Sequence, residues 1–455
     1  MIRTINPTTG EVLEEYSFQD QAQVEKQLEQ GHLVFQDWSR QTLTRKLGAL
    51  QRFEAVLRGE REALARSMTL EMGKPIRQSL AEVDKCVLSC TRLREEFPQW
   101  IKSREYHTSK GHHVHYTPLG VLLGVMPWNF PVWQVVRFAV PALLNGNVIL
   151  LKHAPSTWGT ARLIEKAFQE SFPEDIYQRL EIDVPQIEPI VADPRVRGVS
   201  LTGSKRAGSA LASIAGKYIK KTVLELGGSD AYLILEDADV ELAVEKCTEA
   251  RLQNTGQSCI AAKRFIIHKR HYTTFIEKFA VRMGRARVGD PLNENTDVGP
   301  MARLDLREEL DRQVKKSVAT GSKIVIGGEV ASGPGCFYPP TILKDVRPGQ
   351  VAFDEELFGP VAACVEAHSD REALQLANES KYGLGGAIFS RDVDRARQLA
   401  VEEFDTGMVG INDMVRSDVM APFGGVKDSG LGRELGIEGC FEFCNVKTVI
   451  LSRRS

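Results

Sequence analysis

The feature that most constrains the fold is an alternation of short apolar runs with amphipathic segments between residues 120 and 225. The apolar runs, which predict strands, occupy residues 120–126, 148–152, 196–201 and 221–225. The segments between them, which predict helices, occupy residues 132–144, 157–168 and 205–215. A second alternation begins at residues 231–235 and continues to about residue 411. Because 455 residues exceed what one core holds, we expect an α/β fold with doubly wound parallel sheets in two domains.

The segments that flank this alternation carry other patterns. Residues 2–16 hold turn residues between two extended runs and predict a hairpin. Residues 20–100 carry apolar side chains at helical spacing and predict several helices, the first of them capped by Asp20. Residues 107–118 alternate polar and apolar side chains, and residues 441–452 form a last extended run, so both segments predict strands.

Composition argues against several classes of protein. The formal net charge of -2 provides no basic field for nucleic acid. No apolar run reaches the roughly 20 residues that a membrane helix needs, and the N-terminus carries no apolar signal segment. We therefore expect a cytoplasmic protein with no nucleic-acid or membrane partner.

The cysteines and histidines form no recognisable framework. Eight cysteines in 455 residues are too sparse for a disulfide scaffold. Cys86 and Cys90, like Cys440 and Cys444, lie four residues apart, which predicts buried neighbours on a helix. The histidines of residues 107–118 have no cysteine or carboxylate partner in their pattern, so we expect no metal site.

Cys259 is the candidate nucleophile. It ends the polar, glycine-containing stretch 253–259 and lies downstream of Glu225, which begins a Glu-Leu-Gly-Gly motif. A free thiol has a pKa of ~8.5, so little of it is thiolate at neutral pH unless a nearby base assists it. The pair therefore indicates covalent catalysis through sulfur.

Three further motifs are each ambiguous by themselves. Residues 199–208 run from a strand through a glycine turn into a helix, which suits a bound phosphate and a plain turn equally well. In Pro-Trp-Asn-Phe-Pro at residues 127–131, the amide of Asn129 could donate to an oxyanion, although a helix N-cap is the simpler interpretation. Glu356 and Phe358 could contact a ribose and a flat ring, although solvated glutamates at a helix end are simpler.

Taken in order, the motifs resemble the aldehyde dehydrogenase superfamily. They are Pro-Trp-Asn-Phe-Pro at 127–131, Lys152, Thr-Gly-Ser-x-x-x-Gly from Thr202, Glu-Leu-Gly-Gly from Glu225, Gly-Gln-x-Cys ending at Cys259, Glu-Glu-x-Phe-Gly-Pro from Glu355, and Pro-Phe-Gly-Gly from Pro422. Each motif alone is weak, but seven in this order and spacing are specific. The resemblance extends from Asn6-Pro7 to Lys447-Thr448-Val449 and covers nearly the whole chain.

The resemblance implies a role for each matching residue. Cys259 matches the nucleophile that attacks the aldehyde carbon, and its backbone N–H with the Asn129 amide matches the oxyanion hole. Glu225 matches the base that activates water against the resulting thioester. The residues that match cofactor contacts are Trp128, Lys152, Thr202, Gly203, Ser204, Glu356 and Phe358.

The same resemblance leaves the cofactor open between NAD and NADP. Relatives that prefer NAD often carry a glutamate three positions after the lysine, where it binds the 2′-hydroxyl of adenosine. That position is Pro155 here. Without the carboxylate nothing repels a 2′-phosphate, and Lys152 or Ser156 could bind one.

Within the superfamily, the chain resembles the succinate-semialdehyde dehydrogenases. The motifs that carry this closer resemblance are Leu-Lys-His-Ala-Pro at 151–155 and Trp133-Gln134. Arg137 coincides with an arginine that grips the distal carboxylate of the substrate in those enzymes. A second such arginine is replaced by Gln253, with Arg251 nearest, and the expected serine falls at Asp418, beside Ser417. We expect oxidation of succinate semialdehyde to succinate ahead of other aliphatic or aromatic aldehydes, with Arg137, Gln253 and Ser417 as substrate contacts.

The resemblance also implies a division of the chain. Residues 1–99 and 119–227 match an NAD(P)-binding domain of the Rossmann type, and residues 228–427 match a catalytic domain. Residues 100–118 and 428–455 match a small β element through which subunits assemble. A projecting strand pair covers its edge by pairing with a neighbour, so we expect a homodimer or homotetramer.

Three other classes of protein compete with this interpretation. A reductase of acyl phosphates or acyl-CoA would share the fold but would not need the base Glu225. A cofactor-free thiol hydrolase would need a histidine partner for Cys259, and the motifs contain none. A non-catalytic binding relative would usually lack the nucleophile or the base, and both are present.

Overall fold

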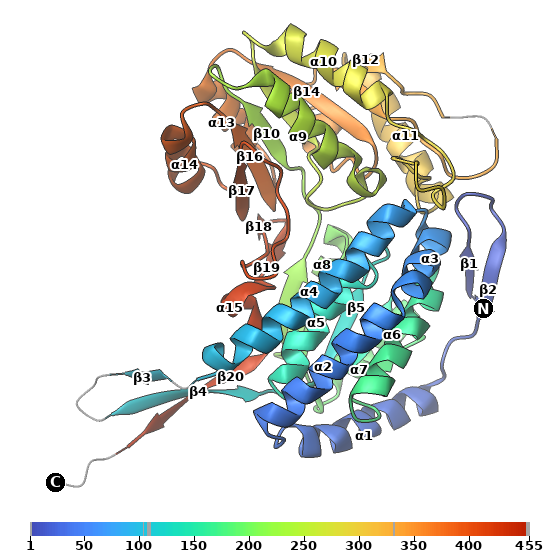
Figure 1. Cartoon of the computed structure of the whole chain (residues 1–455), viewed down its shortest axis with the longest axis vertical. Coiled ribbons are helices and arrows are strands. Elements are labelled where there is room, and N and C mark those ends of the chain that lie inside the picture. The colour runs from blue at the N-terminus through green and yellow to red at the C-terminus, as the bar shows by residue number, and fades with distance from the viewer. Residues whose placement is uncertain (1, 103, 107–110, 331–332, 452–455) are drawn as a thin grey trace.

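The computed structural model describes residues 2–102, 104–106, 111–330 and 333–451 of the chain. It has two lobes, each built on its own sheet, and a small third sheet that projects from the lower lobe (Figure 1). The first two sheets are mainly parallel and covered by helices, which confirms the predicted α/β class.

The first lobe contains a six-stranded sheet. In spatial order its strands are β19 (Gly430–Leu431), β9 (Lys221–Glu225), β8 (Val196–Thr202), β5 (Val121–Met126), β6 (Val148–His153) and β7 (Tyr177–Arg179). The connecting helices are α5 (Trp133–Leu144), α6 (Trp158–Ser171), α7 (Ile187–Ala192) and α8 (Lys205–Lys217). Only β19 runs antiparallel to its neighbour. All six residues of β6 are buried, as expected for a strand covered on both faces.

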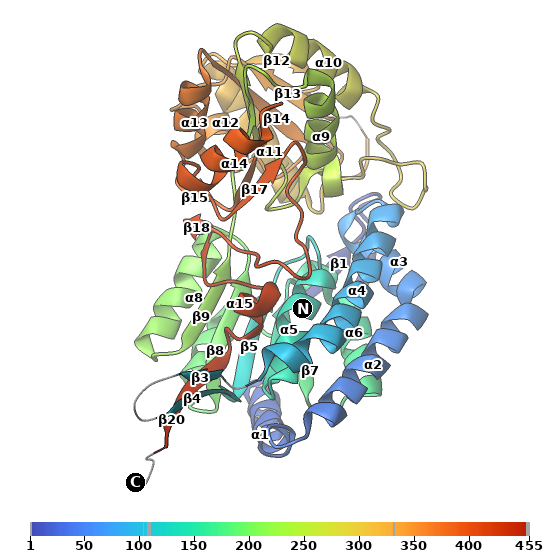
Figure 2. The ribbon, with the colours of Figure 1, turned by 60° about the vertical axis from the view of Figure 1, so that its left-hand side comes forward.

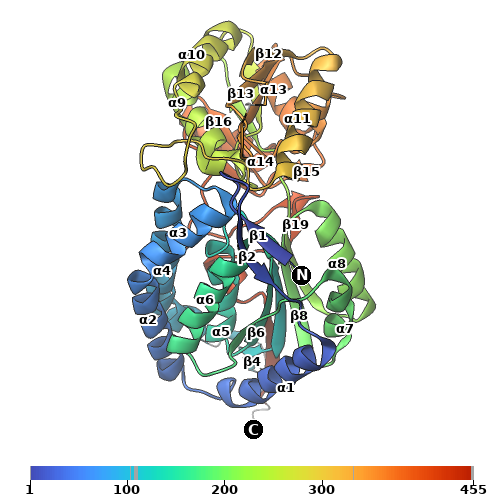
Figure 3. The same cartoon turned by 90° about the vertical axis from the view of Figure 1, so that its right-hand side faces the viewer.

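Four N-terminal helices precede this sheet; the first packs against β5, β6 and β7, and the other three pack on α5 and α6. They are α1 (Gln21–Trp38), α2 (Leu43–Gly59), α3 (Arg61–Met72) and α4 (Ile76–Trp100). Asp20 caps α1 as predicted, because its carboxylate accepts the N–H of Gln23. Phe53 of α2 stacks on Phe168 of α6 with 4.2 Å between ring centroids. Figure 3 shows α2, α3 and α4 on one side of the strands and α7 and α8 on the other.

The N-terminal hairpin is also confirmed. Its strands β1 (Ile2–Ile5) and β2 (Val12–Tyr16) pair antiparallel. The ring of Tyr16 meets Trp158 of α6 edge to face at 5.3 Å. The hairpin therefore packs on the outer side of α6.

The second lobe contains a seven-stranded sheet, which lies above the first in Figure 2. In spatial order its strands are β12 (Lys323–Ile326), β13 (Thr341–Lys344), β14 (Val361–Ala367), β11 (Arg264–His268), β10 (Ala231–Ile234), β16 (Gly385–Phe389) and β17 (Met408–Ile411). Its helices are α9 (Val240–Leu252), α10 (Tyr272–Gly284), α11 (Leu304–Ala319), α12 (Val351–Asp354), α13 (Asp370–Asn378) and α14 (Val393–Glu402). Only β12 is antiparallel, and separate hydrophobic clusters fill the two faces.

The third sheet joins two segments that are distant in sequence. Its strands are β3 (Arg104–Tyr106), β4 (His112–Pro118) and β20 (Cys444–Ile450). β20 pairs antiparallel with β4 from Cys444 opposite Pro118 to Ile450 opposite His112. Both predicted strands are present, although His107 and Ser452, at their expected ends, lie outside the described residues.

A short helix and a pair of short strands lie in the C-terminal part of the chain. They are α15 (Gly436–Cys440), β15 (Tyr382–Gly383) and β18 (Val426–Lys427). Cys86 and Cys90 are buried on α4 as predicted. Cys440 and Cys444 are likewise buried and free, but they are not neighbours on one helix, because α15 ends at the first and β20 begins at the second. In the part of the chain that the structure describes, no helix is long and apolar enough to cross a membrane, and no three potential ligands gather to hold a metal ion.

Candidate active site

The candidate nucleophile lies at the end of an unusually shaped loop, residues 253–259, which we call the nucleophile loop. It follows α9 directly. Asn254, Thr255 and Gly256 have φ angles of 52°, 55° and 72°, so three successive residues are left-handed. For the two residues that are not glycine this conformation costs on the order of 1–3 kcal/mol each, so neighbouring contacts must enforce it.

Side chains from other elements supply those contacts. The N–H of Asn254 donates to Oε1 of Gln78 at 2.6 Å, and its Nδ2 donates to the backbone oxygen of Asn129 at 2.9 Å. The hydroxyl of Thr255 accepts the N–H of Gly299 at 3.0 Å. The strained loop is therefore tied to α4, to the turn after β5 and to the second lobe.

Glycine is the only residue type that fits at position 256. A Cβ there would lie 2.3 Å from the backbone oxygen of Gly359, in addition to the strain of a positive φ. The guanidinium of Arg251 donates to the backbone oxygens of Gly256 at 2.7 Å and Val361 at 3.2 Å. Arg251 is fully buried, which lowers its pKa to about 9. This arginine supports the loop and does not line the cavity described below.

Cys259 is partly exposed, whereas its neighbours Ser258 and Ile260 are buried. Burial of the thiol raises the pKa of Cys259 to about 11, against the lowering effect of the positive charges on Arg137 and Lys263. The ammonium of Lys263 also donates to the backbone oxygen of Ser258 at 2.8 Å. At neutral pH the sulfur is therefore mainly a thiol, and a base must take its proton.

Glu225 is the carboxylate that faces the same region. It ends β9 and is buried, and neither carboxylate oxygen has a hydrogen-bond partner among the described residues. Burial raises the pKa of Glu225, the nearby Glu434 raises it further, and Arg137 and Arg433 oppose the shift. A buried carboxyl group that no protein donor occupies is suited to take a proton from a thiol or from water.

The Asn129 amide is held in one orientation. Its Nδ2 donates to the backbone oxygen of Gln257 at 3.1 Å, and its Oδ1 accepts from Nε2 of Gln134 at 3.1 Å. Since an amide nitrogen carries two hydrogens, one remains for a further acceptor. Asn129 therefore links the turn after β5 to the nucleophile loop with one donor to spare.

One face of α4 reaches the site, although none of the sequence motifs includes a residue of this helix. Gln78, Glu82 and Lys85 follow at spacings that place them along one side of a helix. Glu82 accepts the N–H groups of Val132 and Trp133 at 2.9 Å, so it caps α5. The N-cap interpretation of Asn129 is therefore wrong. The signal that could have identified this face is polar residues recurring at the positions of a buried helical stripe.

The residues matched to cofactor contacts form two groups. In the first, Glu356 accepts the N–H of Gly228 at 3.1 Å and lies 3.4 Å from the ammonium of Lys263. The rings of Trp128 and Phe358 meet edge to face at 5.7 Å. These residues connect the two lobes beside the nucleophile loop.

The second group lies at the turn between β8 and α8. Ser204 caps α8 by accepting the N–H of Ala207 at 3.3 Å, and the N–H of Gly203 donates to the backbone oxygen of Glu225 at 2.9 Å. The hydroxyl of Thr202 accepts from Arg137 at 3.2 Å. The turn is thus anchored to β9, and it presents the positive end of α8 to solvent.

The end of β6, where Lys152 lies, fits a nucleotide. Lys152 is buried, which lowers its pKa. In the following turn, the buried hydroxyl of Ser156 has no partner within the described chain. An orphaned hydroxyl beside a lysine and an open helix N-terminus match the donor set that a dinucleotide phosphate requires. The residues present therefore fit NAD or NADP.

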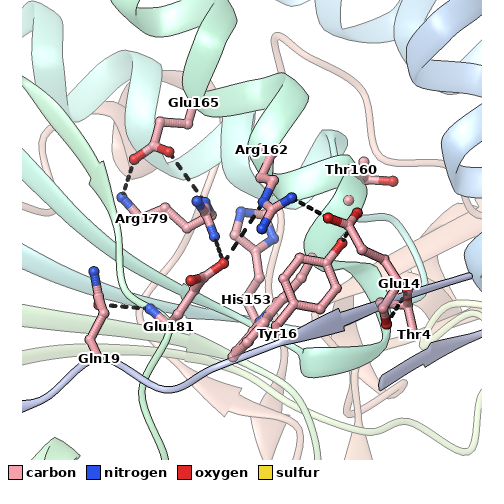
Figure 4. A network of polar contacts seen from close by, with 12 residues as sticks. Thr4, Glu14, Tyr16, Gln19, His153, Thr160, Arg162, Glu165, Arg179 and Glu181 are labelled. Atoms are coloured by element: carbon pink, nitrogen blue, oxygen red, sulfur yellow. Dashed lines mark hydrogen bonds and ion pairs between the residues drawn. The ribbon is translucent and has the colours of Figure 1, made fainter. Parts of the chain in front are cut away.

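A polar network lies around His153, the last residue of β6 (Figure 4). Arg179 of β7 donates to Glu165 of α6 at 3.2 Å and also pairs with Glu181. Arg162 of α6 pairs with Glu14 of the N-terminal hairpin. The network satisfies its own charges, so it fixes β7, α6 and the hairpin around the Lys152 turn.

A cavity of about 930 Å³ opens in front of Cys259. Arg137, Gln253 and Ser417, the three predicted substrate contacts, line it together with the cysteine, and Asp418 lies at its exposed side. Glu225, Asn129 and the cofactor candidates do not line this cavity. The structure therefore separates a substrate-sized space from the residues matched to the cofactor.

Arg137 is already engaged within the protein. Its Nε lies 2.5 Å from Oε2 of Glu434, and its guanidinium lies over the ring of Phe423 at 4.7 Å. With the bond to Thr202, these contacts neutralise and orient the side chain. Arg137 thus faces the cavity as half of a buried ion pair.

Comparison with known proteins identifies the family. The model of the aldehyde dehydrogenase family matches residues 1–449. A succinate semialdehyde dehydrogenase [NAD(P)+] of Escherichia coli is 44% identical over 448 residues, which cover 98% of this chain and 97% of the relative. A succinate-semialdehyde dehydrogenase [NADP(+)] of Deinococcus radiodurans is 40% identical, with 98% of this chain and 94% of the relative covered.

Solved structures show the same architecture. The crystal structure of a succinic semialdehyde dehydrogenase from Streptococcus pyogenes, in complex with NADP+, superposes with a TM-score of 0.97. It is 34% identical to this chain, and each chain is covered completely.

Proposed function

Because this chain belongs to the aldehyde dehydrogenase family, we propose that it oxidises succinate semialdehyde to succinate with NAD or NADP. The observation that carries the proposal is the cavity in front of Cys259, whose walls bear the cations Arg137 and Lys85. A short aldehyde with a distal carboxylate matches a nucleophile at one end and positive charge at the other. The names of the relatives point to the same substrate.

Cys259 and Asn129 form the acylating half of the site. The Cys259 thiol first gives up its proton to solvent. The thiolate then adds to the aldehyde carbon and the carbonyl π electrons move onto oxygen, which gives a thiohemiacetal oxyanion. The free hydrogen of the Asn129 amide and the N–H of Cys259 stabilise that charge. When the C–H bond breaks, the carbonyl re-forms as a thioester on Cys259.

Glu225 serves the hydrolytic half. Its unoccupied carboxylate takes a proton from water, the hydroxide attacks the thioester carbon, and the C–S bond breaks to release the acid. The raised pKa of Glu225 makes its carboxylate a stronger base for this proton transfer.

A bound nicotinamide dinucleotide supplies the acceptor for the hydride. Lys152 and Glu356 would hold its two riboses, Ser204 the pyrophosphate, and Phe358 with Trp128 the nicotinamide side. The unpaired Ser156 hydroxyl and the absence of an acid at Pro155 support acceptance of a 2′-phosphate. These assignments follow the motif matches and agree with the fit described above.

The test is formation of reduced cofactor from succinate semialdehyde by the purified protein. We expect Cys259→Ala to lose on the order of 10⁴-fold or more in kcat. Glu225→Gln should give one burst of reduced cofactor per site, followed by turnover reduced on the order of 10²–10⁴-fold. Wild-type protein that reduces neither cofactor with any aldehyde would overturn the activity. A Glu225→Gln enzyme with full turnover would overturn the role of the base.

We also propose the division of labour along the chain. Residues 1–99 and 119–227 bind the cofactor, residues 228–427 carry catalysis, and residues 100–118 with 428–455 mediate assembly. Support for assembly comes from β20, on which Val446 and Ile450 are each 58% exposed at the edge of the third sheet. Light scattering should show a dimer or tetramer, and a stable monomer would contradict this proposal.

Finally, we propose a cytoplasmic location. All eight cysteines are free, which suits a reducing compartment. Fractionation of the source cells should place the protein with cytoplasmic markers, and recovery outside the cell would contradict the proposal.

A further inference from the structure

We propose that Lys85 of α4, together with Ser417, binds the distal carboxylate of the substrate, a role that sequence resemblance assigns to Arg137. The proposal rests on the proposed function, since it names the group that recognises the acid end of the aldehyde. It makes Lys85 a specificity-determining residue of the cavity.

Lys85 lines the cavity, and the partners of its ammonium are neutral groups that leave the positive charge free to bind an anion. Its ammonium donates to the hydroxyl of Ser417 and lies 4.2 Å from the centroid of the Trp133 ring. Both partners also line the cavity. Across residues 2–102, 104–106, 111–330 and 333–451, no carboxylate lies within the 4.0 Å of an ion pair from this ammonium. An aromatic face and a hydroxyl therefore position the cation without neutralising it.

Arg137 differs on each of these points. Its guanidinium is paired with the buried Glu434 and bonded to Thr202. Binding a substrate carboxylate through it would require sharing or breaking a buried ion pair, which leaves a second buried acid beside Glu225. The arginine is better explained as the residue that neutralises Glu434 and moderates the pKa values of Cys259 and Glu225.

The other cations around the cavity do not compete for the carboxylate. Arg77 pairs with Asp297, Arg282 with Glu245 and Arg416 with Asp413. Arg285 is exposed to solvent, where an ion pair contributes little. Arg285 therefore offers a matched control, because it lines the same cavity and carries the same charge without being buried.

The electrostatic surroundings of Lys85 favour an anionic ligand. Burial, together with the positive charge of Arg137 on α5, lowers the pKa of Lys85 to about 8. Glu82 and Cys86 on α4, and Asp418 beside Ser417, act in the opposite direction. A carboxylate bound at Lys85 would restore the charged form, so the free energy of binding includes relief of this destabilisation.

The experiment compares two aldehydes of equal length, succinate semialdehyde and butanal, in four enzymes: wild type, Lys85→Met, Lys85→Arg and Arg285→Met. For Lys85→Met we expect the KM for succinate semialdehyde to rise on the order of 10- to 100-fold, with kcat nearly unchanged. Its kinetics with butanal should stay at the wild-type level, which shows that the fold and the chemistry are intact. Lys85→Arg should recover part of the preference, and Arg285→Met should behave as wild type.

The pH dependence gives a second readout that a structural role would not produce. In the wild type, the ratio of kcat/KM for the acid to that for butanal should fall as pH rises through about 8, because Lys85 loses its proton there. In Lys85→Met the ratio should be low and independent of pH. Taking the ratio cancels the titration of Cys259 and Glu225, which both substrates share.

The outcomes separate the two proposals. A wild-type enzyme that shows no preference for the acid overturns the proposed substrate. A wild-type preference that Lys85→Met retains overturns the role of Lys85 while the proposed function stands. If Arg285→Met also loses the preference, the acid is attracted by the overall positive charge around the cavity. That result would also overturn a specific contact with Lys85.

Discussion

The two sides of the cavity are built in different ways. On one side, the nucleophile loop of residues 253–259 is held by side chains from both lobes in a conformation that costs energy. On the other side, which we call the distal wall, Lys85 reaches the cavity with a hydroxyl and an aromatic ring as its partners. Many contacts fix the position of the nucleophile loop, whereas two partners position the Lys85 side chain on the distal wall.

This difference matches the tasks that we assign to the two sides. A nucleophile and an oxyanion donor must be placed within a fraction of an ångström, and many interlocking bonds achieve this. Recognition of a distal carboxylate needs a charge at the right distance, which one long side chain can provide. Changes on the nucleophile side should therefore affect every aldehyde, whereas changes on the distal wall should affect acids alone.

Among the changes that compare the two sides of the cavity, the largest effect is expected for Asn129→Ala. Removing the oriented amide deletes one donor to the oxyanion, so kcat should fall on the order of 10²–10³-fold. The loss should be equal for succinate semialdehyde and butanal, measured as formation of reduced cofactor. A loss confined to the acid substrate would place Asn129 functionally on the distal wall and break the comparison.

Gly256→Ala tests the strain of the nucleophile loop. The added Cβ meets the backbone oxygen of Gly359, so the loop must shift and Cys259 moves with it. A displacement of about 1 Å should lower kcat roughly 10²-fold for both aldehydes. Gly349→Ala is the matched control, because Gly349 also has a positive φ but no atom lies within 4 Å of the new Cβ.

If Gly349→Ala lowers activity as much as Gly256→Ala, the effect comes from general destabilisation. Thermal unfolding of both variants distinguishes these cases, since the backbone cost of an alanine at positive φ is common to both. A Gly256→Ala enzyme with full activity would show that the loop tolerates movement. This result would contradict the conclusion that catalysis depends on the fixed position of the nucleophile loop.

The protonation of Cys259 gives a smaller, graded test of the same side. Its pKa is raised to about 11, so the thiolate fraction below that value grows tenfold for each pH unit. The rate of Cys259 alkylation by iodoacetamide should therefore rise about tenfold per unit between pH 7 and 9. A rate that levels off near pH 7 would mean that the positive charges of Arg137 and Lys263 lower the pKa of Cys259 more than burial raises it.

The sequence predicted the elements of the fold better than the distal wall. Four strands and three helices between residues 120 and 225 are encoded by local apolar runs, so their pattern alone located them. The three-residue strand β7 was missed because it is too short to show a period. Cys440 and Cys444 were misplaced because four-residue spacing does not distinguish a helix from a helix-to-strand junction.

Motif order also directed attention to the nucleophile, the base and the amide, because each lies at the end of a predicted strand or in a compact motif. The pairing of Arg137 with Glu434 joins residues about 300 positions apart, which no local pattern reveals. Lys85 belongs to a helix that the motifs do not include, and its role depends on the loop that carries Ser417. Contacts between distant segments were therefore the part that required coordinates.

The smallest expected effect is on the distal wall, for Ser417→Ala. This change removes the hydroxyl that positions the Lys85 ammonium, so the KM for succinate semialdehyde should rise roughly 2- to 10-fold, as for one neutral hydrogen bond. Butanal should be unaffected. If Ser417 acts through Lys85, adding Ser417→Ala to Lys85→Met should raise KM no further, because the group that it positions is already gone. Additive effects in the double variant would instead mean that Ser417 contacts the carboxylate independently, and the distal wall would then have two separate points of recognition.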